Sequence, residues 1–308
     1  MRLPTRGFAM ADIAAAVAPQ VVERSRPQPR RRGLMLRLAG NQRVVVGFAV
    51  LLFTFVVAVL AAQLAPYDPN AQTLTARLGP PNSAHPFGSD QLGRDVLSRV
   101  IWGSRVSLGV GFSSVLITIV IGTAIGIAAG YKGGWVDGVL MRFVDVFISI
   151  PVFMLLLTIV AIYGSNVPLL ITFIGVSAFP GAARIVRAEV LSLMPREFIA
   201  ASRVIGSTPY RIMVRHILPN LVPIIVVSAT LRVGAAILTE AGLSYFGLGV
   251  PPPAPTWGGM VSDGRTSLDV AWWVSTFPGL ALLVVVIATN LVGDGLRDVF
   301  DPRRAHLA

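Results

Sequence analysis

The 308-residue sequence predicts an all-α integral membrane protein with six membrane-spanning helices. Apolar residues make up 54% of the chain, charged residues only 13%, and the mean hydropathy is +0.71. A soluble domain of this size would therefore have too little polar surface to cover its core. Long apolar stretches recur along the chain, and the basic residues gather in alternate connections between them.

The first predicted span covers residues 44–64, which contain no charged side chain. About 21 residues at roughly 1.5 Å per residue cover the ~30 Å hydrocarbon layer of a bilayer. The other five predicted spans cover residues 104–130, 137–163, 167–185, 219–243 and 273–292. The second span carries glycines at spacings that allow close helix approach: Gly109, Gly111, Gly122, Gly126 and Gly130.

The distribution of arginine predicts the orientation of these spans. An even number of spans places both termini on one side of the membrane. Assigning residues 1–43, 131–142, 184–215 and the C-terminus to the cytoplasm collects 20 of the 26 Lys and Arg residues. The opposite connections hold prolines and interface-type aromatics, namely Trp102, Trp257 and Trp272. We therefore expect both termini to be cytoplasmic.

The sequence thus divides into three parts: a basic cytoplasmic tail (1–43), a transmembrane domain (44–293) and a cytoplasmic C-terminal tail (294–308). The transmembrane domain contains external loops at 66–103 and 244–272 and a long cytoplasmic loop at 186–218. The basic tail is interpreted as a solvated anchor that attracts anionic membrane lipid, in preference to a nucleic-acid-binding segment.

Several enzyme classes are disfavoured by composition. The chain has no cysteine, which excludes disulfides and thiolate metal sites, and its three histidines never approach HExxH spacing. The sole lysine, Lys132, lies in Tyr-Lys-Gly-Gly and not in a Walker A motif. ATP hydrolysis is therefore not expected on this polypeptide, and an intramembrane hydrolase is disfavoured because no histidine lies in a span to activate a serine.

The loop between the fourth and fifth spans is long, about 30 residues, and its pattern predicts two short helices. Pro195 and Glu197 suit the first turn of one helix. Gly206 can end that helix in a left-handed cap, after which Ser207 or Thr208 can cap a second helix with Pro209 in its first turn. The first helix is expected to place apolar side chains near one face: Phe198, Ala201, Val204 and Ile205.

This loop resembles the EAA loop of bacterial ABC importer permeases. The positions that match the motif are Ala201, Gly206, Leu218 and Pro219. The chain departs from the motif at Ala200, where the family has glutamate, at Ser202, where it has alanine, and at His216, where it has isoleucine. The resemblance implies contact with a partner ATPase through Glu197, Ala200, Ala201, Ser202, Arg203, Gly206 and Pro209.

Two longer stretches narrow the family: HPFGSDQLGRDVLSRVIWGSRVSL at 85–108 and TEAGLSYFGLGVPPPAPTWGGM at 239–260. They are similar to the C-type permease subunit of dipeptide and oligopeptide ABC importers. The resemblance implies a six-helix type I permease fold with a cytoplasmic coupling helix in the bacterial inner membrane. It also implies a heterodimer with a homologous permease, two ATP-binding domains that carry ATP and Mg, and an extracytoplasmic peptide-binding protein.

The resemblance therefore implies a non-catalytic subunit that forms half of a peptide pore and needs no cofactor of its own. Two alternatives for the whole chain remain open: a permease for nickel or another small solute, and an autonomous secondary transporter. For the 197–209 segment, the alternative is an amphipathic helix that rests on lipid headgroups.

Charged residues inside spans are functional candidates because they are costly in the bilayer. Arg232 and Glu240 in the fifth span either line the transport pathway or pair with the partner permease. Arg142 and Asp145 are expected to neutralise each other one turn apart.

A second group of charges precedes the second span. Asp90, Arg94, Asp95 and Arg99 are interpreted as an external amphipathic helix in which Asp95 pairs with Arg99. A metal site there is disfavoured.

Overall fold

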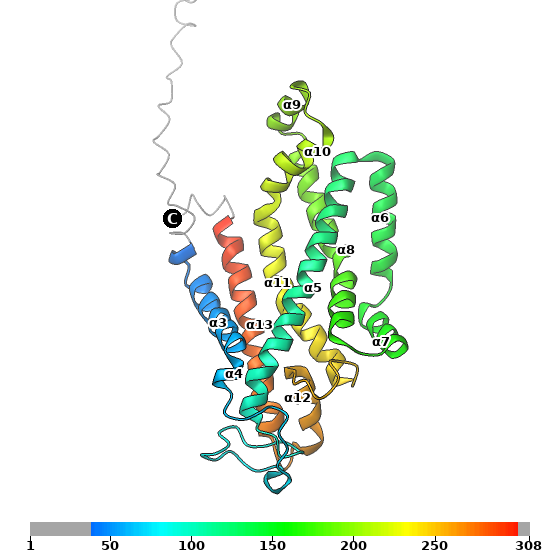
Figure 1. Cartoon of the computed structure of the whole chain (residues 1–308). Helices are drawn as coiled ribbons and strands as arrows, with labels where there is room; N and C mark the ends of the chain where they lie inside the picture. The colour runs from blue at the N-terminus through cyan, green and yellow to red at the C-terminus, as the bar shows by residue number, and fades with distance from the viewer. Residues whose placement is uncertain (1–37, 301–308) are drawn as a thin grey trace, which may run out of the picture.

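The computed structural model describes residues 38–300, which are almost entirely helical and contain no strand beyond one isolated bridge (Figure 1). Most of the predicted basic tail and the last eight residues lie outside this range. The helices before the long loop are α3 Gln42–Val59, α4 Ala61–Leu64, α5 Val96–Lys132, α6 Gly134–Ser149, α7 Val152–Tyr163 and α8 Val167–Leu193. The later helices are α9 Glu197–Val204, α10 Pro209–Ile212, α11 Leu218–Tyr245, α12 Trp257–Gly264 and α13 Trp273–Phe300.

Short turns complete this set. Two 3-10 turns, η1 Leu74–Ala76 and η3 Arg265–Ser267, lie in the non-spanning connections. A π-helical turn, η2 Met213–Ile217, joins α10 to α11, so that Pro209–Tyr245 forms one helical rod.

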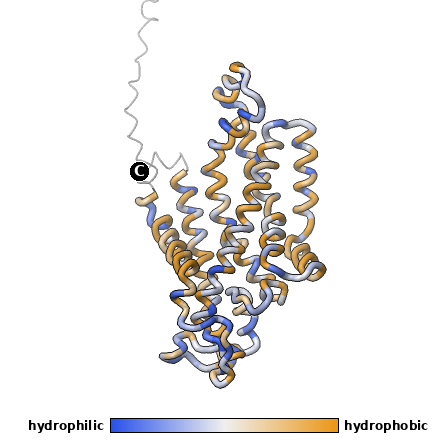
Figure 2. Tube along the Cα trace, viewed as in Figure 1, coloured by the Kyte–Doolittle hydropathy of each residue, from blue (hydrophilic) through white to orange (hydrophobic). Residues whose placement is uncertain are grey.

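Five helices are long and apolar enough to cross a membrane, and the number is six if the bent pair α6 and α7 counts as one span. Apolar residues dominate the middle of the bundle and polar residues gather near its ends (Figure 2). The short helix α9 lies at one end of the bundle, whereas α12 and the 65–95 connection lie at the other (Figure 1). These two ends are called the α9 end and the α12 end below.

The third span, predicted at 137–163, is sharply bent. It consists of α6 and α7, which are bent by 77° at Ile150 and Pro151. Ile150 is extended (φ −91°, ψ 125°) because the ring of a following proline disfavours the helical conformation, and Pro151 itself has no N–H to continue the ladder.

The tightest helix pair is α5 against α8, and the predicted small residues of α5 explain it. A Cβ atom placed on Gly122, Gly126 or Gly130 would lie 2.5–2.8 Å from atoms of α8. Those distances are too short for any side chain, so the expected close approach is confirmed at these positions. Gly109 differs, because a Cβ there would meet no atom within 4 Å.

The remaining spans pack around this pair. Helix α13 lies between α3 and α11, and Gly47 on α3 would place a Cβ 2.7 Å from the Ala288 carbonyl of α13. On the other side, Gly234 of α11 would place a Cβ 2.6 Å from Thr289 Oγ1. The rod is thereby pressed against α13 at a point nearer to Tyr245 than to Pro209.

Candidate functional site

The α9 elbow, residues 197–209, folds as its sequence predicts. Helix α9 ends in two nested hydrogen bonds: Gly206 N donates to Arg203 O (3.0 Å) and Ser207 N donates to Ser202 O (3.1 Å). This is the Schellman arrangement, and it places Gly206 in the left-handed region at φ +83°. Thr208 then caps the next helix by accepting from Arg211 N at 3.3 Å. The two predicted helices and the bend between them are confirmed.

One side of α9 is anchored to the bundle. Ile199 is fully buried and Ser202 nearly so, and Ile199 packs in a cluster with Leu193, Ile212 and Leu221. The Ser202 hydroxyl donates to the Phe198 carbonyl at 2.7 Å, which satisfies its buried polar group. The elbow is therefore anchored through Ile199 to side chains of α8 and of the α10–α11 rod.

The opposite side of the elbow is exposed and apolar. Val204 is 88% exposed, Ile205 83% and Tyr210 72%. Sequence periodicity grouped Val204 and Ile205 with Phe198 on one face, but the packed side centres on Ile199 and Ser202. Docking against α8 and α11 determines which side is buried, and it leaves two large aliphatic side chains free for another surface.

The proposed coupling residues divide accordingly. Ser202 is buried in the anchor. The others are exposed at the α9 end: Glu197, Ala200, Ala201, Arg203, Gly206 and Pro209. The Arg203 guanidinium lies 6.0 Å from the centre of the Tyr131 ring, so it lies against the end of α5.

A cavity of about 740 Å³ opens between α8, α11 and α13 in the half of the bundle nearer the α9 end. Its walls are mostly aliphatic, with Arg232, Glu189 and Arg297 among the charged residues. Arg232 Nε donates to Ser228 Oγ at 3.2 Å and Nη1 donates to the Ala178 carbonyl at 3.3 Å. Among residues 38–300, no carboxylate lies within ion-pair distance of Arg232.

Glu240 does not border this cavity, so the structure separates the two candidate charges of the fifth span. Its side chain is fully buried, and Oε1 accepts from the Ser244 hydroxyl at 2.6 Å. The start of α12 packs over this part of α11, because a Cβ on Gly258 would lie 2.4 Å from Ala241 Cα. Glu240 thus marks a tight junction between α11 and α12.

The charges before the second span form a buried cluster and not an external amphipathic helix. Asp90 is its centre: Oδ2 accepts from Arg94 Nε at 2.6 Å and lies 3.6 Å from Arg99 Nε. Asp90 Oδ1 also accepts from the backbone N–H groups of Leu92 and Arg94 at 2.9 Å. Two guanidinium groups therefore share one buried carboxylate at the α12 end.

The predicted Asp95–Arg99 pair is wrong, because the Asp95 carboxylate has other partners. It caps α5 by accepting from Ser98 N at 2.7 Å, and its other oxygen lies 2.9 Å from His85 Nδ1. Arg99 Nη1 instead donates to the Pro69 carbonyl at 3.1 Å.

The charge cluster also joins the 65–95 connection to α12. Arg94 Nη2 lies 3.7 Å from Asp263 Oδ2, and Gln91 Nε2 donates to the Asp263 carbonyl at 2.6 Å. Partial burial raises the pKa of the Asp263 carboxyl, and the positive charges of Arg99 and Arg94 oppose that rise. Two segments far apart in sequence are fastened into one cap over the bundle.

Arg142 and Asp145 are not paired either. Asp145 on α6 pairs with Arg184 of α8 at 2.5 Å, and Asp137 forms a two-pronged pair with Arg187 at 2.5 Å. These bridges fasten the peripheral helix α6 to α8, which intra-helix spacing alone does not reveal.

The family of binding-protein-dependent transport system inner membrane components matches residues 122–306. The N-terminal transmembrane domain of oligopeptide transport permease C matches residues 31–81. The resemblance found in the motifs at 85–108 and 239–260 is thereby confirmed.

Individual relatives align along most of their length. A glutathione transport system permease protein of Pectobacterium atrosepticum is 40% identical over 94% of this chain and 96% of its own. A dipeptide transport system permease protein of Bacillus subtilis is 39% identical over 87% of this chain and 84% of its own. Among solved structures, an inward-facing MetNI methionine ABC transporter matches with a TM-score of 0.54 and 25% identity, covering 67% of this chain and 97% of that one.

Proposed function

This chain belongs to the family of binding-protein-dependent transport system inner membrane components, and from that premise we propose that it forms half of the pore of an ATP-driven peptide importer. Its six-span arrangement is the type I permease fold of ABC importers. The relatives named for dipeptide and glutathione transport support a di- or oligopeptide cargo.

The α9 elbow is the observation that carries this proposal. A short helix, fixed by a left-handed cap and a buried anchor, presents Val204 and Ile205 beyond the end of the bundle. An apolar knob of this kind suits a groove on a second protein. We assign the α9 end to the cytoplasm, where two ATP-binding subunits with ATP and Mg engage it, while the homologous permease completes the pore.

At the α12 end, the cap formed by the 65–95 connection and α12 faces the exterior in this orientation. It is the surface offered to an extracytoplasmic peptide-binding protein. Because the Asp90 charge cluster ties both segments together, the cap can receive a partner as one body.

The assignment of the elbow is tested by capturing the ATP-binding subunits. Tagged full-length chain, purified from its native membrane in mild detergent, should retain ATP-hydrolysing subunits. Ile205→Arg should remove them, because a charge replaces an exposed aliphatic contact in the knob. The matched control is Val270→Arg, an exposed aliphatic residue (68%) at the opposite end, which should leave capture intact. Equal capture by both variants contradicts the assignment.

The cavity that Arg232 borders is proposed as this chain's share of the transport pathway. The Arg232 guanidinium hydrogen-bonds only to neutral oxygens and borders a mostly aliphatic cavity, so it favours binding of an anionic group. The terminal carboxylate of a peptide is such a group. The hydrogen bonds to Ser228 and Ala178 orient the group without neutralising it.

Arg232→Gln is expected to slow uptake of a dipeptide with a free carboxylate by about tenfold, the value of one charge-assisted hydrogen bond. Radiolabelled uptake into proteoliposomes holding the whole complex measures this, with Arg232→Lys as the charge-retaining control. A dipeptide amide, which lacks the carboxylate, should be transported equally by the parent and the Gln variant. Equal slowing of both peptides would indicate a purely structural role.

A further inference from the structure

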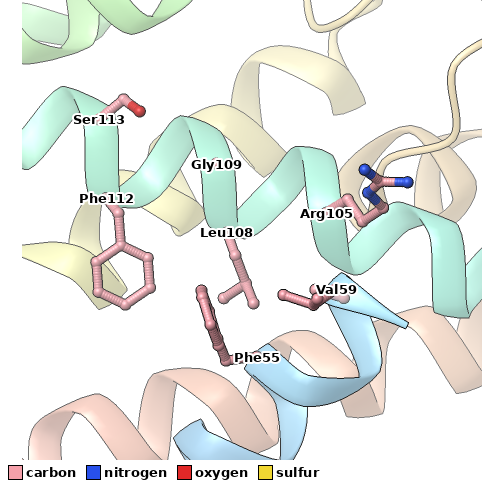
Figure 3. A pocket seen from close by; sticks show the side chains of 8 residues that line it. Phe55, Val59, Arg105, Leu108, Gly109, Phe112 and Ser113 are labelled. Atoms are coloured by element: carbon pink, nitrogen blue, oxygen red, sulfur yellow. The ribbon is translucent and has the colours of Figure 1, made fainter. Parts of the chain in front are cut away.

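A second hollow, of about 350 Å³, lies between α3 and α5 toward the α12 end (Figure 3). Phe55 and Val59 of α3 and Leu108 and Phe112 of α5 point into it from its two walls (Figure 3). Its base is Gly109, where an added Cβ would meet no atom within 4 Å. Unlike the glycines that bring α5 onto α8, this glycine keeps a space open.

Arg105 borders this hollow at one end, and its guanidinium points away from Leu108 and Phe112 (Figure 3). The side chain is exposed, and its guanidinium lies 5.0 Å from the centre of the Trp102 ring. No carboxylate of the described part of the chain lies within 4.0 Å of it. Tryptophan is enriched where the hydrocarbon layer meets the headgroups, so a Trp–Arg pair near the end of a spanning helix suits contact with lipid phosphates.

We infer that the α3–α5 hollow binds an anionic phospholipid, with its phosphate on Arg105 and one acyl chain along the aliphatic and aromatic walls. The lining runs from Arg105 to Ser113, about 12 Å of helix rise, which suits the upper part of an acyl chain. The orientation proposed above places the lipid in the outer leaflet.

Native mass spectrometry of the full-length chain in mild detergent tests the inference, with phosphatidylglycerol as the probe and phosphatidylcholine of identical chains as the neutral comparison. The parent should retain phosphatidylglycerol preferentially. Arg105→Gln should lower that retention about tenfold, the value of a charge-assisted phosphate contact. Gly109→Leu should lower retention of both lipids, because it fills the hollow.

Arg265→Gln is the matched control. Arg265 is also exposed at the α12 end and also lies over an aromatic ring, 5.3 Å from the centre of Tyr245, but it does not line the α3–α5 hollow. Its replacement should leave retention unchanged. If both arginine variants lost the same amount of bound phosphatidylglycerol, retention would depend only on general surface charge. That result would overturn the proposed lipid site.

A photo-crosslinking residue at Phe112 tests occupancy in the native membrane and does not depend on the stability of the Gly109 variant. Irradiation should attach lipid to the chain. Attachment to another protein helix, such as that of the second permease, would overturn the inference. Because neither measurement uses ATP or peptide, the lipid site and the transport function can fail independently.

Discussion

Gly206→Val is expected to uncouple peptide uptake from ATP hydrolysis, so that the complex still hydrolyses ATP. Gly206 has φ +83°, and a β-branched residue resists the left-handed region at a cost of about 1–3 kcal/mol. A Cβ at Gly206 would meet nothing within 4 Å, so the damage arises from the backbone bend and not from a clash. With the elbow distorted, we expect uptake in proteoliposomes to fall by about tenfold or more, the factor that 1–3 kcal/mol of misalignment can produce.

Gly206→Asn is the companion variant, because asparagine adopts the left-handed region more readily than other residues with a side chain. It should retain most uptake, and both variants should insert into the membrane in normal amounts. ATP hydrolysis and uptake are measured on the same preparation, so that their ratio reports coupling. Normal uptake by the valine variant would remove the elbow from the transport mechanism.

Asp90→Ala is expected to loosen the cap at the α12 end by about 3–5 kcal/mol. The substitution leaves the guanidinium groups of Arg94 and Arg99, 8% and 4% exposed, without the carboxylate that they share. It also removes two hydrogen bonds to backbone N–H groups. Limited proteolysis of the purified full chain should show rapid cleavage between residues 65 and 95.

Asp68→Ala is the control for this substitution. Asp68 also accepts from a backbone N–H, that of Asn70 at 2.7 Å, but it is exposed, so its loss should change stability by only about 0.5 kcal/mol. Asp90→Asn separates charge from backbone bonding, because the amide oxygen can still accept from Leu92 and Arg94. Proteolysis of Asp90→Ala no faster than that of Asp68→Ala would contradict a stabilising role for the cluster.

The spans and the elbow were predictable because their causes are local. Apolar length predicts a membrane crossing, and Gly206, Thr208 and Pro209 each favour one backbone conformation at their own position. Pro151 disfavours a continuous helix, but the sequence does not predict the 77° bend found there. Proline excludes a continuous helix without specifying the direction in which the chain resumes.

Charge partners were not predictable, because they depend on packing between segments distant in sequence. Arg94 pairs with Asp263, which lies far away in sequence, and Asp145 pairs with Arg184 on another helix. Spacing of three or four residues suggested Asp95 with Arg99 and Arg142 with Asp145, and neither pair forms in the described chain. The burial of Glu240 likewise results from close packing of Gly258 against Ala241. The local sequence around Glu240 does not reveal this contact.

The continuous rod from Pro209 to Tyr245 has a mechanical consequence. Its contact with α13 at Gly234 can serve as a fulcrum, with an arm of roughly 37 Å toward α9 and one of roughly 16 Å toward α12. Tilting such a lever moves the short arm less than half as far as the long one but with more than twice the force. A wide, weak stroke at the elbow would therefore become a small, strong displacement at the opposite membrane surface.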